Sequence, residues 1–200
     1  MPALSSTLEM RWFLPGQIDL EVADWFEHRC PGQPLSAQTR TDRYLQMPSC
    51  ETVSIKLREG RFEVKWRQQA LGLQVYAKQR AAWLQQRPLE GQLEQWHKLS
   101  YSDLFATQQP MPPATPARWL AVHKHRQLRS AQNVQIELVQ LTLKQQPWWS
   151  LSLEAALSPA AQQRLNAIAQ QISETYPGPT LLATQSQAFP AWLLQIETAL

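Results

Sequence analysis

One stretch with strict alternation constrains the fold of this chain more than any other feature. From Val53 to Arg67 it reads VSIKLREGRFEVKWR, and apolar residues alternate with polar or charged ones on both sides of Glu59-Gly60. Period-two alternation around an acidic residue and a glycine predicts a β-hairpin with a tight turn. That turn sets three cross-strand pairs, which are Arg58 with Arg61, Lys56 with Glu63, and Ser54 with Lys65.

The second face of this hairpin is strongly basic. It carries one carboxylate among five cations, which are Lys56, Arg58, Arg61, Lys65 and Arg67 around Glu63. A solvated outer sheet face is the ordinary interpretation of such alternation, and the hairpin alone favours it. The alternative is the inner wall of a barrel that binds a polyanion, with the apolar face packed outward under helices. Because like charges opposite each other destabilise a sheet, clustered cations need solvent or a neutralising ligand.

Length and composition predict one globular domain over residues 1–200. The chain is 44% hydrophobic and 18% charged, as in folded domains of this size. A net charge of +3 is a mild basic bias that does not indicate specific nucleic-acid binding. The first residues lack a secretory signal, and no apolar run approaches the ~20 residues of a membrane span. We therefore expect a cytoplasmic protein with no membrane partner.

Cysteine, histidine and tryptophan give no specific site. Cys30 and Cys50 form no CxxC pair, and no Cys/His cluster has zinc spacing. His123 and His125 would share one strand face, and surface histidines are the favoured interpretation over a metal site. The Trp148-Trp149 pair is interpreted as core or rim packing, with a contact surface as the alternative.

The rest of the chain adds strands and few helices. Further strands are predicted over Thr7–Leu14, Gln38–Met47, Gly91–Tyr101, Arg118–Arg126, Val134–Lys144 and Trp148–Ala156. Helices are predicted over Asp19–Arg29 and from Ser158 to Thr175, with Ser158 as N-cap and Pro159 at the first position. Ala70–Ala82 is ambiguous between strand and helix. Thr107–Pro116 is a Pro-rich loop inside the domain, and Ala188–Leu194 is a docked apolar tail.

Seven or eight strands without a βαβ rhythm predict an α+β fold, an antiparallel β-barrel with a few flanking helices. The chain contains no Gly-rich phosphate loop, no nucleophile elbow and no dinucleotide fingerprint. These three motifs therefore give no indication of function.

Charged motifs follow one another along these strands. They are Thr7-Leu8-Glu9-Met10-Arg11, the Arg-x-Asp-x-Tyr of Arg40, Asp42 and Tyr44, then Lys56 with Arg58, Glu63 with Lys65, Lys124 with Arg126, Glu137, Ser152 with Glu154, and the tail 186–193. In this order the chain resembles the CYTH superfamily, the triphosphate tunnel enzymes. Members include class IV adenylate cyclases, thiamine triphosphatases and inorganic or RNA triphosphatases. The resemblance implies an antiparallel eight-stranded tunnel-like β-barrel, and it turns the charged face of the hairpin inward.

The resemblance also implies a site. The phosphate-binding set would be Arg11, Arg40, Lys56, Arg58, Glu63, Lys65, Lys124 and Arg126. Glu9, Glu137 and Glu154 would be the catalytic carboxylates and would hold Mg²⁺ or Mn²⁺, with Glu63 as a further candidate. The chain departs from the family pattern: Thr7 and Ser152 stand where carboxylates are expected, and Arg11 stands where the pattern has lysine.

These departures leave the function open between three hypotheses. The first is metal-dependent hydrolysis of a triphosphate or related phosphoester, in which the cations offset charge in the transition state. The second is a catalytically inactive module on the same fold that binds a polyphosphate or other polyanion. The third is an interaction protein that uses a Trp-rich surface. The expected partner is a phosphate-rich small molecule and not a specific nucleic acid, and a dimer is one option for the oligomeric state.

Overall fold

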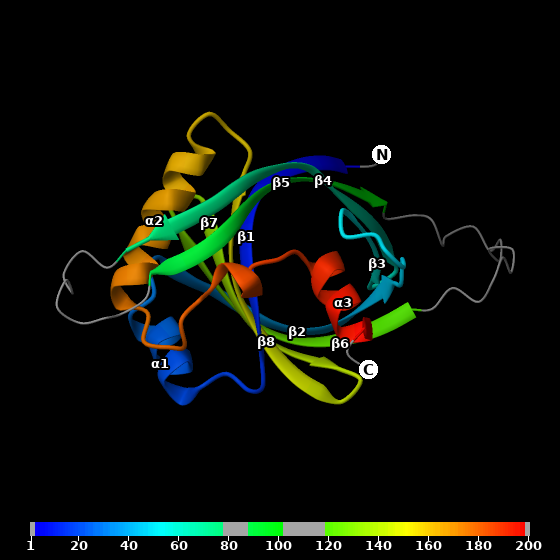
Figure 1. Cartoon of the computed structure of the whole chain (residues 1–200), viewed down its shortest axis with the longest axis horizontal. Helices are drawn as coiled ribbons and strands as arrows, with labels where there is room; N and C mark the ends of the chain where they lie inside the picture. The colour runs from blue at the N-terminus through cyan, green and yellow to red at the C-terminus, as the bar shows by residue number, and fades with distance from the viewer. Residues whose placement is uncertain (1–2, 78–87, 102–118, 199–200) are drawn as a thin grey trace, which may run out of the picture.

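The fold is a closed antiparallel barrel of eight strands. The computed structural model describes residues 3–77, 88–101 and 119–198, and the strands pair in the order β1-β5-β4-β3-β2-β6-β7-β8 (Figure 1). The strands are β1 Ala3–Pro15, β2 Gln33–Leu45, β3 Val53–Arg58, β4 Arg61–Tyr76, β5 Leu89–Tyr101, β6 Trp119–Ala131, β7 Val134–Leu143 and β8 Gln146–Ala156. The helices are α1 Leu20–His28, α2 Ala161–Thr175, the short 3₁₀ helix η1 Ala183–Gln185, and α3 Phe189–Thr198. The predicted α+β tunnel-like barrel is confirmed.

The predicted hairpin is β3 and β4. Arg58 pairs with Arg61, Lys56 with Glu63 and Ser54 with Lys65, as the alternation predicts. Glu59 and Gly60 both have positive φ angles, of 47° and 75°. Two-residue turns with two positive φ angles match the twist of the flanking strands, which fixes this register.

The main hydrophobic core lies outside the barrel wall. Alternate residues of β1, β7 and β8, among them Trp12, Leu138 and Leu151, are buried together with Trp25 of α1 and Ile168 of α2. Figure 1 shows α1 and α2 against the outer side of the strands. Because side chains alternate across a strand, this packing leaves the inward positions of the same strands for other groups.

A second apolar cluster lies inside the barrel. Phe13 and Val139 face inward and pack against Trp192 of α3, whose ring stacks on Phe13 at 4.5 Å between centroids. Figure 1 shows α3 within the ring of strands. Trp148 packs against this cluster and Trp149 belongs to the outer core, so the packing interpretation of the Trp pair is confirmed.

The structure resolves one ambiguous segment and corrects one predicted helix cap. β4 continues to Tyr76, so the ambiguous Ala70–Ala82 segment is a strand up to that residue, and its positions from 78 lie outside the described residues, as does Thr107–Pro116. The N-cap of α2 is Ala160, and the prediction of Ser158 was wrong. A turn precedes the helix, in which the Ser158 carbonyl accepts from the Ala161 amide at 3.0 Å. The Ser158 hydroxyl instead accepts from Arg164 at 2.8 Å.

No helix in the described part of the chain combines the length and apolarity needed to cross a bilayer.

Gly91 of β5 tests how tightly the outer core is packed. A Cβ at this position would overlap the Met10 sulfur and the Trp12 ring. We expect Gly91→Ala to lower the free energy of unfolding by about 1–3 kcal/mol, the usual cost of overpacking a core. Urea unfolding measures this, and Gln69→Ala, on the exposed surface of the neighbouring strand, is the control. Equal stability of the two variants would contradict the packing described.

Candidate functional site

The interior of the barrel contains a charged cavity of about 270 Å³. Side chains from all eight strands and from the start of α3 line it. Its basic lining residues are Arg11, Arg40, Lys56, Arg58, Lys65, Lys98, Lys124 and Arg126, and its acidic ones are Glu9, Glu63, Glu94, Glu137 and Glu154. The structure therefore brings every residue of the predicted site together around one cavity, with the basic face of the hairpin turned inward.

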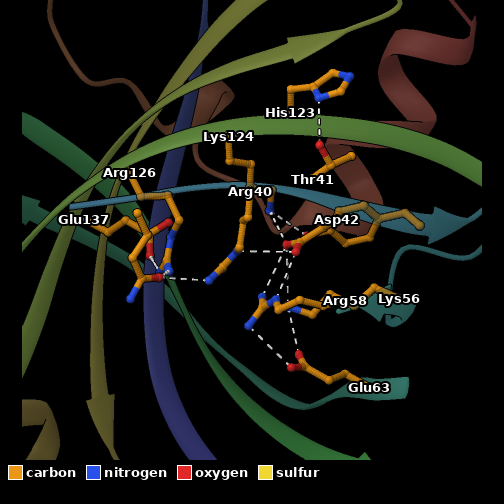
Figure 2. Close-up of polar contacts among 12 residues, drawn as sticks. Arg40, Thr41, Asp42, Lys56, Arg58, Glu63, His123, Lys124, Arg126 and Glu137 are labelled. Atoms are coloured by element: carbon orange, nitrogen blue, oxygen red, sulfur yellow. Dashed lines mark hydrogen bonds and ion pairs between the residues drawn. The ribbon is translucent and has the colours of Figure 1, made fainter. Parts of the chain in front are cut away.

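Asp42 holds four cations in place. Its side chain is fully buried and lies 2.9 Å from Arg58 Nε and 3.0 Å from Lys124 Nζ. Arg40 Nε lies at 3.3 Å and Lys56 Nζ at 3.9 Å, as Figure 2 shows. Burial alone would raise the pKa of Asp42, but Lys124 and Arg58 hold it well below its ordinary range. Asp42 is therefore ionised and fixes cations from β2, β3 and β6 on the cavity wall.

Glu137 of β7 organises a second group of cations. Arg126 Nη2 donates to its carboxylate at 2.5 Å, and Arg11 Nη1 lies 3.6 Å away. Burial opposes ionisation here too, yet Arg11 and Arg126 lower the pKa of Glu137 to about 2. The Glu137 carboxylate is therefore ionised and paired with two arginines, and any other cation would have to displace them.

Glu63 joins the hairpin to the Asp42 group. Lys56 Nζ lies 2.8 Å from its carboxylate and Arg58 Nη1 lies 3.4 Å from it. Burial and the neighbouring Arg58 lower the pKa of Lys56 to about 8. Glu63 thus positions two predicted phosphate-binding cations, and an anion in the cavity would meet these cations, not the carboxylate.

Three carboxylates lie in one row across neighbouring strands. Glu9 of β1 is the register partner of Glu94 on β5 and of Glu154 on β8. Glu9 accepts from Lys65 and from Thr7, and this contact with Lys65 keeps its pKa low despite burial. The charge of Glu9 raises the pKa of Glu154. Thr7, where the family pattern has a carboxylate, is thus a hydrogen-bond donor to Glu9.

The carboxylates predicted to hold Mg²⁺ or Mn²⁺ do not fit a metal centre as arranged. Glu9 is engaged by Lys65, and Glu137 by Arg126 and Arg11, so a cation would compete with these partners. Within the described ranges, no group of three or more His, Cys, Asp or Glu side chains could hold a metal ion. Hard divalent cations need several free carboxylate oxygens, and this arrangement offers mainly those of Glu154.

Phe189 of α3 covers part of the cation cluster. Lys124 Nζ lies 3.8 Å from the centre of its ring, and the Arg11 guanidinium carbon lies 5.1 Å from it. The ring also stacks on Tyr44, with 5.1 Å between centroids. The face of an aromatic ring attracts a cation and also excludes water from it. Phe189 therefore brings α3 over the cations at this end of the cavity and removes water from them.

Three residues with a clear place in the site were not in the predicted set. Asp42 stood in the Arg-x-Asp-x-Tyr motif without a role, and its alternation with Arg40 and Tyr44 onto one strand face was the available signal. Lys98 lines the cavity opposite Lys65 and forms no ion pair with any residue that the structure describes. Its alternation with Glu94 and Trp96 was the available signal. Nothing in the tail sequence indicated that Phe189 reaches the cations.

Known proteins resemble this chain in fold but hardly in sequence. No family model and no curated protein matches the chain. The chain is similar to the PH1012 protein of Pyrococcus horikoshii at 12% identity and a TM-score of 0.49, over 90% of this chain and 94% of that one. The PH1819 protein of the same organism is also similar, at 12% identity and a TM-score of 0.49, over 96% of this chain and 99% of that one. An RNA triphosphatase of S. pombe is similar at 9% identity and a TM-score of 0.35, over 86% of this chain and 77% of that one. These distant likenesses assign no function, and the tunnel fold rests on the strand pairing.

Removing the charge of Asp42 tests its place in the fold. We expect Asp42→Asn to lower the free energy of unfolding by about 3–5 kcal/mol, because it leaves buried cations without their counter-ion. The control is Asp24→Asn in α1, whose exposed contacts with His28 and Arg29 should contribute only about 0–1 kcal/mol. Chemical unfolding of the two variants should separate them clearly, and similar losses would contradict the role of Asp42.

Acid should weaken the fold through Glu137. Its folded pKa of about 2 lies below its ordinary 4.5, so the unfolded chain binds more protons in this range. The stabilisation is complete above about pH 4.5 and is lost as the pH falls towards about 2, an effect on the order of 3 kcal/mol. Urea unfolding at about pH 7 and about pH 3 measures it. Glu137→Gln should be less stable at neutral pH and lose less on acidification; an unchanged acid response would refute the assignment.

Proposed function

We propose that this CYTH-like tunnel binds a compact, phosphate-rich anion of the triphosphate or polyphosphate class. The observation that carries the proposal is the convergence of eight basic side chains from six different strands on one cavity of about 270 Å³. Arginine suits bidentate contacts with phosphate oxygens, and lysine contributes a point charge. Both kinds are present on opposite walls of the cavity.

Unsatisfied donors support an anion in this place. Arg126 Nε is buried and has no hydrogen-bond partner among the described residues, and Arg40 Nε has only its 3.3 Å ion pair with Asp42. Buried donors normally have partners, and a phosphate oxygen is a strong acceptor for a guanidinium. Lys98, without an ion pair among the described residues, adds a cation on the wall formed by β4 and β5.

The size of the cavity favours a small ligand over a nucleic acid. Cavities for drug-sized ligands range from about 300 to 1,000 Å³, and this one lies just below that range. An inorganic polyphosphate, or the phosphate chain of a larger molecule, is the class of ligand that combines small size with several negative charges. A long nucleic-acid strand would need an extended basic surface instead.

Binding without hydrolysis is the form of this proposal that the side-chain arrangement supports. Hydrolysis remains the second candidate because Glu9 and Glu154 are register partners on the cavity wall. Metal-dependent turnover would require Glu9 to separate from Lys65, and Glu137 to separate from its arginines, before these carboxylates could bind a metal ion. Mg²⁺ or Mn²⁺ dependence is therefore the part of the resemblance that this arrangement supports least.

Titration calorimetry with tripolyphosphate tests the binding. We expect the wild-type chain to bind, and Lys65→Gln with Lys98→Gln to weaken binding at least about tenfold, since charge-assisted contacts are worth about 1.5–3 kcal/mol each. Arg61→Gln is the matched control, because this exposed cation flanks the same hairpin turn and does not line the cavity. Equal affinity in all three proteins, or no binding by the wild type, would overturn the proposal.

A phosphate-release assay separates the two candidates. We expect no release from tripolyphosphate with Mg²⁺ or Mn²⁺ while binding persists. Release that is abolished by Glu137→Ala with Glu154→Ala, in a variant that still binds, would establish hydrolysis in its place.

A further inference from the structure

Two histidines lie side by side on the outer face of the barrel, away from the cavity. His123 and His125 alternate on β6 with Lys124 and Arg126, whose side chains face inward. Both imidazoles belong to exposed residues. Figure 2 shows His123 on the other side of the β2 and β6 ribbons from Asp42. The pair is therefore separate from the proposed anion site and does not depend on it.

Each imidazole is held by a threonine of the neighbouring strand. His123 Nδ1 lies 2.7 Å from the Thr41 hydroxyl, and His125 Nδ1 lies 2.9 Å from the Thr39 hydroxyl. The pairs are direct register partners, because Thr41 stands opposite His123 and Thr39 opposite His125 on β2. Two adjacent side chains thus share one orientation, with the same ring nitrogen turned towards β2.

This orientation suits metal coordination. When Nδ1–H donates to the threonine oxygen, the other ring nitrogen, Nε2, carries a free lone pair. Metal-binding histidines usually donate their second ring N–H to an oxygen in this way, which fixes tautomer and ring direction. We propose that His123 and His125 form a two-imidazole site for a borderline transition-metal ion of the Zn²⁺, Ni²⁺ or Cu²⁺ class.

The strand spacing is compatible with one shared ion. Residues two apart on a strand lie about 6.6 Å apart along it. Imidazole nitrogens bind Zn²⁺ at about 2.0–2.1 Å, so two of them on one ion lie about 3.3 Å apart. Each Nε2 atom must therefore move roughly 1.6 Å towards the other, a shift that small rotations of exposed side chains provide.

The rest of the coordination shell is open. No third His, Cys, Asp or Glu of the described residues joins the pair to form a cluster. The ion would keep water in its remaining positions, as ions with few protein ligands do. Hard cations such as Mg²⁺ prefer oxygen and would not bind here, which separates this site from the ions expected of a phosphate tunnel.

The test is titration of the untagged chain with Zn²⁺ at neutral pH, in a Cys50→Ser background that removes the half-exposed thiol. We expect one ion per chain, and a loss of at least about tenfold in affinity for His123→Ala with His125→Ala. Thr39→Val with Thr41→Val keeps both imidazoles and should weaken binding about 10- to 100-fold, the usual effect of losing such supporting partners.

A matched control comes from the same barrel. His97 of β5 makes a similar contact, with Nδ1 2.6 Å from the Ser6 hydroxyl, but has no second histidine beside it. His97→Ala should leave Zn²⁺ affinity unchanged. Nitrogen-15 spectra of the imidazoles should show Nε2 shifts for His123 and His125 and none for His28 or His97.

Two results would overturn the proposal. One is Zn²⁺ affinity that survives loss of both histidines, which would place the ion elsewhere, for example on the cavity carboxylates. The other is a half-ion stoichiometry with dimer formation, which would show that two chains, and not the pair within one chain, hold the metal.

Discussion

The ion group around Asp42 is the interaction on which the interior of this barrel depends. Cations that line one cavity repel one another, and buried charges are tolerated only when they are paired. Asp42 contacts four cations from β2, β3 and β6, and Glu63 and Glu137 extend the pairing to β4, β7 and β1. These carboxylates make a basic interior compatible with folding, and they also hold each cation in a fixed direction.

This pairing shapes how a ligand would enter. An incoming phosphate competes with carboxylates for the same guanidinium and ammonium groups, so its net gain is smaller than the number of cations suggests. The unpartnered Nε donor of Arg126 and the ammonium group of Lys98 are available without such an exchange. Phe189 adds a second influence, since its ring over Lys124 lowers the exposure of that charge to water.

The sequence predicted those features that follow from local alternation. The β3–β4 register followed from period-two patterns. The inward direction of Lys56 and Lys65 and the closed eight-stranded tunnel were implied by the family resemblance, because alternation alone favoured an outward, solvated face. The sequence could not predict which cations would share Asp42, because these partners come from strands far apart in the chain. Nor could it show that Glu137 is held by Arg11 and Arg126, which weakens the expected metal centre. The N-cap of α2 was missed because a turn took the place of the Ser158 cap.

The position of the hydrophobic core outside the wall has a consequence for how such a protein can change. In most barrels the inward residues are the core, and a substitution there costs stability. Here Trp12, Leu138, Leu151 and the helices α1 and α2 supply that stability from the outer side. Inward positions outside the ion pairs of Asp42, Glu63 and Glu137 can therefore exchange one charge for another while the scaffold persists. Substitutions in the lining of such a tunnel can therefore change the ligand that it binds, or replace catalysis by binding, while each intermediate sequence still folds.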